Sequence, residues 1–63
     1  MENKYREMRK RAGITSTQAA ANLNVSVTTL MNWEQGKTSP KCEKLLDMMR
    51  LYSCTANELL GLS

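Results

Sequence analysis

Residues 13–40 read GITSTQAAANLNVSVTTLMNWEQGKTSP, and they contain two short helix patterns joined by about three residues. Thr15 and Gln18 have the spacing of a capping box, in which a hydroxyl and an amide each bond a free backbone N–H of the first helical turn. A helix is therefore expected to start at about Ser16. It is expected to end at Asn24, because asparagine tolerates a positive φ better than most residues.

A second helix is expected from Val27 to about Gln35. Ser26 is a favourable N-cap residue, and Gly36 suits the left-handed conformation that follows many helices. A connection of about three residues is typical of a helix-turn-helix corner, in which the second helix crosses the first at a steep angle. Residues 16–35 are therefore predicted to form a helix-turn-helix.

The segment before this motif carries the positive charge of the chain. The formal net charge is +3, and residues 1–12 account for the whole of this excess. Tyr5, Met8 and Ala12 recur at helical spacing, and Gly13 follows at the place of a C-terminal cap. Residues 1–12 are therefore expected to form a helix with one apolar stripe and a basic outer face.

The segment after the motif predicts two more helices. Ser39 is a suitable cap for a helix with Pro40 in its first turn. The apolar positions of this helix follow the i, i+3, i+4, i+7 spacing, and they are Cys42, Leu45, Leu46, Met49 and Tyr52. Its polar positions, expected to face solvent, are Lys41, Lys44, Asp47 and Arg50. Thr55 and Glu58 form another capping box, which opens a short last helix.

Five short helices without a strand pattern predict a compact all-α fold. At 63 residues the chain is expected to be a single domain, residues 1–63, that buries only about 60% of its unfolded surface. The methionines Met8, Met48 and Met49 are expected to fill gaps in its core. No apolar run is long enough to span a membrane, and the charged N-terminus does not resemble a signal peptide. We therefore expect a cytoplasmic protein.

The composition argues against a catalytic or metal-binding function. Histidine is absent, and the only cysteines are Cys42 and Cys54. Twelve helical residues would separate these two by about 18 Å, whereas a disulfide requires about 7 Å or less. The carboxylates form no recognisable pair, and no glycine-rich phosphate loop occurs. We therefore expect no enzyme activity, no metal and no cofactor.

The second helix of the motif has an unusual outer surface, because no charged side chain occurs from Ala12 to Trp33. Leu30 and Trp33, with Val25 just before the helix, form the stripe expected to turn inward. The positions left outside are Val27, Thr28, Thr29, Met31 and Asn32. Surface helices normally carry lysine and glutamate, whereas hydroxyl, amide and methyl groups match base edges in the DNA major groove. From these residues alone, burial of this helix against a partner protein or the rest of the fold is an equal alternative.

Residues 13–40 resemble the helix-turn-helix of the phage-repressor family (Cro/cI type, also called the XRE family). The resemblance depends on the Val-Ser pair at residues 25–26 and the Trp-Glu-Gln-Gly-Lys segment at residues 33–37. It extends across nearly all 63 residues. It implies a five-helix, lambda-repressor-like DNA-binding domain whose helix-turn-helix consists of helices 2 and 3.

The resemblance also implies roles for single residues. The positions that match base-reading residues of the family are Val27, Thr28 and Asn32, with Met31 at the margin. The positions that match phosphate contacts are Ser16, Thr29, Gln35 and Lys37. A structural ion pair is implied between Arg9 and Glu34. Further affinity is expected from the helix N-termini and from the basic cluster of helix 1.

Three residues depart from the family pattern. Ser16 stands where the family usually has a glutamine that braces against phosphate, so the side chain at this position is shortened to a hydroxyl. Val27 stands where many members carry a polar or basic residue, so this position can only touch a methyl group and favours thymine. Ala19 stands where they carry leucine, which predicts a thinner core.

The resemblance implies a transcriptional regulator, expected to be a repressor that binds a double-stranded DNA operator as a homodimer. No small-molecule ligand or membrane partner is expected. Leu59, Leu60 and Leu62 are either the dimer edge or core residues. The alternative function is a protein-interaction module of the same fold, antitoxin-like or an accessory factor of a mobile element, in which Val27 and Met31 would contact a protein.

Overall fold

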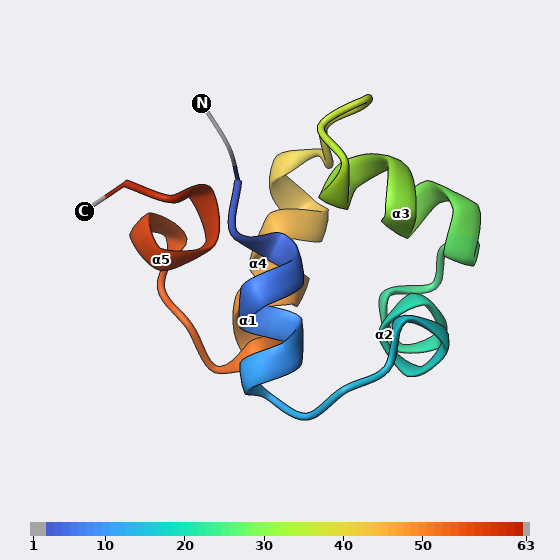
Figure 1. Ribbon diagram of the computed structural model, residues 1–63, viewed down its shortest axis with the longest axis horizontal. Helices are drawn as coiled ribbons and strands as arrows, with labels where there is room; N and C mark the ends of the chain where they lie inside the picture. The colour runs from blue at the N-terminus through green and yellow to red at the C-terminus, as the bar shows by residue number, and fades with distance from the viewer. Residues whose placement is uncertain (1–2, 63) are drawn as a thin grey trace.

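The computed structural model describes residues 3–62, and these form five helices. They are α1 (Tyr5–Arg11), α2 (Ser16–Leu23), α3 (Val27–Glu34), α4 (Cys42–Tyr52) and α5 (Ala56–Leu60). Figure 1 shows α2 end-on and α3 lengthwise, so the two helices of the motif cross steeply, with α1 and α4 between them and α5. The expected all-α, five-helix fold is confirmed. Of the helix predicted over residues 1–12, Met1 and Glu2 lie outside the described residues.

Three helices, α2, α3 and α5, begin at residues whose side chains cap the first turn, and the local sequence determines these starts. The two predicted capping boxes, from Thr15 to Gln18 and from Thr55 to Glu58, are both formed. Ser26 caps α3, since its Oγ accepts a hydrogen bond of 3.1 Å from the Thr29 N–H. These contacts span only three residues, which is why the sequence alone predicted them.

All five helices within residues 3–62 end in the same way. In α2, Asn24 adopts φ 59°, and the Val25 N–H donates to the Ala20 carbonyl at 3.0 Å. This bond is part of the Schellman motif, in which a left-handed residue reverses the chain and satisfies carbonyls at the helix end. The equivalent donors after α1, α3, α4 and α5 are Ile14, Lys37, Cys54 and Leu62. The corner between α2 and α3 is therefore built by a local motif centred on Asn24.

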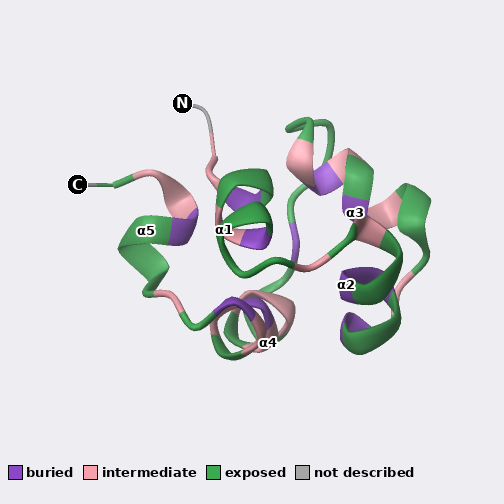
Figure 2. Cartoon of the chain, turned by 60° about the horizontal axis from the view of Figure 1, so that its bottom comes forward, coloured by how far each residue is buried: buried purple, intermediate pink, exposed green. Residues whose placement is uncertain are grey.

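The core takes side chains from all five helices, and Figure 2 shows the buried residues turned toward the interior. Its buried apolar members are Tyr5, Ala19, Ala20, Leu23, Leu30, Trp33, Met48, Tyr52 and Leu59. The predicted burial of Leu30 and Trp33 is confirmed, and the half-buried Val25 packs against the same core. The predicted role of the methionines is confirmed as well, because Met48 is fully buried and Met8 and Met49 pack on the core.

The predicted start of α4 was wrong. The helix begins at Cys42 with Lys41 at the N-cap position, and no side chain caps it. Pro40 lies before the helix and is buried, whereas Ser39 is exposed and does not cap it. Burial of the proline ring contributes apolar contact to the loop that approaches α4, which agrees with a path in which Pro40 precedes the helix.

The predicted inner face of α4 is confirmed at Leu45, Met49 and Tyr52 but was wrong at Cys42 and Leu46. Met48 and Tyr52 are buried and Leu45 and Met49 are half-buried, whereas Cys42 and Leu46 are exposed. Cys42 and Leu46 also fit helical spacing, because they lie three residues before Leu45 and Met49 at the edge of one wide apolar stripe. Packing of α4 against α1, α2 and α5 selects the side that turns inward.

Helix α1 differs from its predicted amphipathic pattern at two positions. Ala12 lies beyond the last helical residue and is exposed, and Arg9 is buried instead of facing solvent. Arg9 can turn inward because Glu34 of α3 neutralises it there. Among residues 3–62, no helix has both the length and the apolar character needed to cross a bilayer.

Candidate nucleic-acid interface

Four side chains of α3 lie together on one face, which we name the outer face of α3: Val27, Thr28, Met31 and Asn32. Val27 and Met31 are 36% and 42% exposed, Thr28 is exposed and Asn32 is half-buried. Leu30 and Trp33 point the opposite way, into the core. The structure therefore brings together the four residues predicted to read bases and leaves them accessible.

The residues predicted to contact phosphates lie at the helix ends. Gln35 and Lys37 follow α3 and are exposed, while Ser16 and Thr29 are half-buried in the first turns of α2 and α3. The Thr29 Oγ1 lies 2.9 Å from the Ser26 Oγ, so the two hydroxyls share one hydrogen bond. Lys37 forms no ion pair with any residue in the range 3–62. Its ammonium group is therefore free to meet an anion.

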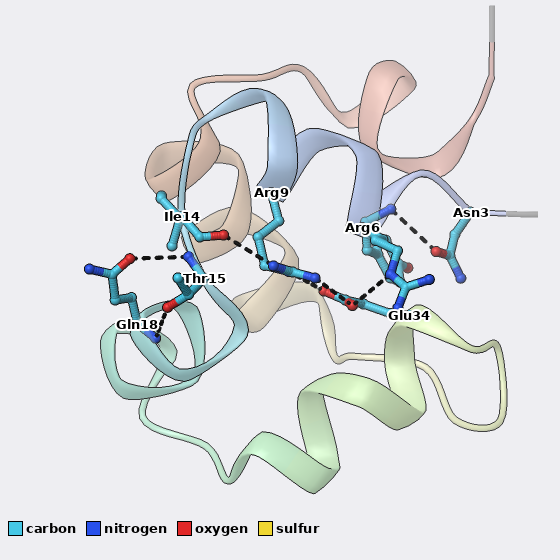
Figure 3. A network of polar contacts seen from close by, with 8 residues as sticks. Asn3, Arg6, Arg9, Ile14, Thr15, Gln18 and Glu34 are labelled. Carbon is cyan, nitrogen blue, oxygen red and sulfur yellow. Dashed lines mark hydrogen bonds and ion pairs between the residues drawn. The ribbon is translucent and has the colours of Figure 1, made fainter.

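A buried ion pair attaches α3 to α1 (Figure 3). Arg9 Nε donates to Glu34 Oε2 at 2.7 Å and Arg9 Nη2 donates to Glu34 Oε1 at 3.3 Å. Arg9 Nη1 also donates to the Ile14 carbonyl at 3.1 Å, which ties in the loop before α2. The hydrogen bond with Glu34 raises the pKa of Arg9 above its ordinary value. The ion pair predicted between these two residues is confirmed, and it fixes α3 against the rest of the fold.

Asn3 makes a second contact with the end of α3, which sequence reasoning missed. Its Nδ2 donates to the Trp33 carbonyl at 3.0 Å, and its Oδ1 accepts from the Tyr5 N–H at 3.2 Å. Next to it, the Lys4 N–H donates to the Leu59 carbonyl of α5 at 3.0 Å. An asparagine just before a helix start is a typical capping residue, which could have indicated the bond to Tyr5. The bond to α3 depends on tertiary packing alone.

Lys44 of α4 makes another contact that the sequence did not reveal. Its Nζ donates to the Leu23 carbonyl at 2.7 Å, so an ammonium group caps the C-terminal end of α2. Lys44 was expected to face solvent but is half-buried. A cation is favourable at this place because the carbonyl end of a helix carries a partial negative charge. The first helix of the motif is thereby held to the core.

The basic cluster of helix 1 is less available for phosphate binding than expected. Arg9 is buried against Glu34, and Arg11 Nη1 lies 2.9 Å from Glu58 Oε2. Lys4 pairs more loosely with Glu7 at 3.4 Å. The exposed Lys10 has no ion pair within residues 3–62, and the 66%-exposed Arg6 side chain only approaches Glu34 at 4.0 Å. Three of the five basic side chains of this cluster, Lys4, Arg9 and Arg11, are thus paired with carboxylates.

Tyr52 lies beside the ion pair of α1 and α3 and is an unusual core residue. Its hydroxyl is buried and has no hydrogen-bond partner among the described residues. Burial raises the pKa of Tyr52 to about 12, the negative charge of Glu34 adds to the rise, and Arg9 opposes it. The hydroxyl therefore stays protonated and neutral at physiological pH.

Comparison with known proteins identifies the fold that this geometry represents. Residues 6–61 match the family described as Helix-turn-helix domain. The chain belongs to this helix-turn-helix family. The family that the sequence resembled is thereby confirmed.

Two relatives of this helix-turn-helix domain are named as a transcriptional regulator and a transcriptional activator. The HTH-type transcriptional regulator ImmR of Bacillus subtilis (strain 168) is 34% identical over 58 residues, which are 92% of this chain and 46% of ImmR. The HTH-type transcriptional activator BcrR of Enterococcus faecalis is 37% identical over 58 residues, which are 92% of this chain and 28% of BcrR. The chain thus spans less than half the length of either relative.

A solved structure supports the same assignment for the helix-turn-helix domain. The crystal structure of a transcriptional regulator from Listeria innocua is similar with a TM-score of 0.77 and 28% sequence identity. The similarity covers 97% of this chain and 61% of that chain. Nearly the whole five-helix arrangement, and not the two-helix motif alone, is therefore shared.

Proposed function

We propose that this helix-turn-helix domain binds double-stranded DNA sequence-specifically and regulates transcription. The observation that carries the proposal is the outer face of α3, which is accessible, uncharged and lined by hydroxyl, amide and methyl groups. The names of the relatives support the regulatory part. In this proposal α3 enters the major groove.

Each residue of the outer face has a chemical counterpart on a base edge. The amide of Asn32 can bond adenine at both N6 and N7, and the hydroxyl of Thr28 can donate or accept. Val27 and Met31 offer only apolar contact. The buried ion pair of Arg9 and Glu34 supports this function, because contacts to bases require a helix held at a fixed angle to the domain.

Phosphate contacts would place the outer face in register on the duplex. Lys37 and Gln35 extend beyond the C-terminal end of α3, and Ser16 lies in the first turn of α2. Backbone N–H groups at a helix start attract anions, which compensates for the short Ser16 side chain. These contacts add affinity without reading sequence.

We also propose that the domain binds DNA as a homodimer. One outer face holds too few base contacts for tight specific binding, and two copies could read half-sites one helical turn apart. Leu59 is fully buried and belongs to the core, whereas Leu62 is 44% exposed and Leu60 half-buried. Leu62, with the accessible part of Leu60, is therefore the proposed edge. Repression remains a prediction, since BcrR is named as an activator.

The test is an amide NMR titration of the chain with a duplex obtained by selection from a random DNA pool. We expect shifts at residues 27–32 and at Lys37, and a loss of operator preference in the double variant Thr28→Ala, Asn32→Ala. Asn57→Ala is a matched control, because Asn57 is an exposed asparagine on α5. If no sequence is enriched and the α3 signals stay unchanged in a titration with mixed duplex DNA, the result would instead favour the protein-interaction module.

A further inference from the structure

The outer face of α3 carries two exposed apolar side chains four residues, or about one helical turn, apart: Val27 and Met31. Within residues 3–62 only four large hydrophobic side chains are exposed, and the other two, Leu46 and Leu62, lie on α4 and after α5. The neighbours of this pair on the same face, Thr28 and Asn32, are polar. An apolar pair at this place therefore faces whatever α3 binds.

We propose that Val27 and Met31 read the C5-methyl groups of two thymines in each half-site. This inference rests on the proposed function, because it assumes that α3 lies in the major groove. The thymine methyl is the apolar feature that base pairs present there. Each apolar side chain is followed by a polar one, so that Val27 with Thr28 and Met31 with Asn32 form two similar reading units. Each unit combines a methyl contact with a hydrogen bond.

The spacing of the pair sets the spacing of the two thymines. Four helical residues correspond to about 6 Å along the axis of α3. Successive bases of one strand are about 3.4 Å apart. The two methyl groups should therefore lie about two base steps apart if α3 runs parallel to the base stack, and closer together if it is inclined. A half-site in which the thymines are widely separated would not fit the helix.

The two reading positions differ in stiffness. Val27 is β-branched and is the first residue of α3, directly after the Ser26 cap, so its side chain has few rotamers to choose from. Met31 is unbranched and flexible, and it borders a hollow that is also lined by Arg6, Glu34 and Gln35. A flexible side chain adapts to more than one partner. The position read by Val27 should therefore be the stricter of the two.

The experiment replaces thymines of the selected operator one at a time by deoxyuridine, which removes only the C5-methyl group. Burial of one methyl corresponds to about 0.8 kcal/mol, or about a fourfold change in Kd. We expect two positions per half-site, no more than about two steps apart, to lose affinity, with about a fourfold loss at the Val27 position and a smaller loss at the Met31 position. In Val27→Ala the first loss should vanish, and in Met31→Ala the second.

Leu46→Ala is the matched control, because Leu46 is 47% exposed but lies on α4; this variant should keep both deoxyuridine effects. Folding of each variant is checked by its circular dichroism melt. If an operator is selected but deoxyuridine changes no affinity, or the losses persist in both α3 variants, methyl reading is wrong while DNA binding stands. If no duplex is enriched, the proposed function fails and this inference with it.

Discussion

Two arginines of α1 form ion pairs with glutamates of two different helices, α3 and α5. The two pairs differ in how far their side chains are exposed to solvent. Arg9 reaches Glu34 of α3 at 2.7 Å, and Arg11 reaches Glu58 of α5 at 2.9 Å. The side chains of the first pair are 10% and 6% exposed, whereas those of the second are 49% and 42% exposed. The two ion pairs thus have similar lengths, but the one that joins α1 to α3 is largely buried and the one that joins α1 to α5 is exposed to solvent.

From this difference we expect burial, and not distance, to decide how strongly each ion pair constrains its helix. Water and salt screen the exposed pair of Arg11 and Glu58, so it contributes little to stability. The Arg9 side chain is only 10% exposed, so little water can replace Glu34, and Arg9 also donates to the Ile14 carbonyl. The buried pair therefore cannot open without leaving a charge without a partner in the interior.

This asymmetry agrees with the proposed roles of the two helices. A helix that reads bases must keep one orientation, and α3 is held by the buried pair and by Asn3. A helix at a dimer edge can adjust when a second copy binds, and α5 is joined through an exposed pair and the backbone bond from Lys4 to Leu59. The contrast between the two contacts can be tested by removing each of them.

The largest effect is expected for Glu34→Ala. Arg9 would be left buried without its carboxylate, which costs about 3–5 kcal/mol and approaches the whole stability of so small a domain. Chemical denaturation followed by circular dichroism should show the loss. The double variant Arg9→Met, Glu34→Leu removes both charges and should be more stable than Glu34→Ala, although the Ile14 carbonyl loses a donor. A loss below about 1 kcal/mol in Glu34→Ala would show that the buried pair does not constrain α3.

An intermediate effect is expected for Asn3→Ala. This variant removes the bond to the Trp33 carbonyl and the bond from the Tyr5 N–H, and each such bond contributes about 0.5–1.5 kcal/mol. Urea unfolding should give a free energy lower by about 1–2 kcal/mol, and amide exchange near the end of α3 should accelerate. Asn57→Ala, the exposed control on α5, should leave both measurements unchanged. Equal stability of the two variants would mean that Asn3 does not hold α3.

The smallest effect is expected for Glu58→Gln, which removes the charge but keeps a residue that can complete the capping box. The hydrogen bond from Arg11, followed by the bond from the Thr55 backbone, lowers the pKa of Glu58 below its ordinary value of 4.5. A lowered pKa in the folded state means that ionised Glu58 stabilises the fold above about pH 4.5 and that this stabilisation is lost as the pH falls through the folded value.

Thermal melts should therefore show a small advantage of the wild type over Glu58→Gln at pH 7, which shrinks below pH 4.5 and in high salt. In an Arg11→Met background the advantage at pH 7 should already be reduced. An advantage that grows on acidification would contradict the assigned partner. A loss as large as that of Glu34→Ala would remove the contrast between the two sides of α1.

Much of the site could be predicted because its signals are local or follow a family pattern. The caps at Thr15 and Ser26 and the left-handed turn at Asn24 each depend on residues within one or two helical turns. The pair of Arg9 and Glu34 came from the resemblance, since 25 residues separate its members. The contacts of Asn3 and Lys44 carried no comparable pattern, because their acceptors are backbone carbonyls that any residue provides.

The sequence by itself determined where most helices begin and end, that α2 and α3 form a helix-turn-helix, and that the exposed side of α3 carries no charge. These properties depend on backbone hydrogen bonds and side-chain types over short distances. Only the tertiary structure decided which side of α4 turns inward, where Arg11 and Lys44 find partners, and that Leu59 is core while Leu62 is exposed. The reason is that such choices depend on how helices cross, and an apolar or charged residue suits several neighbours until packing selects one.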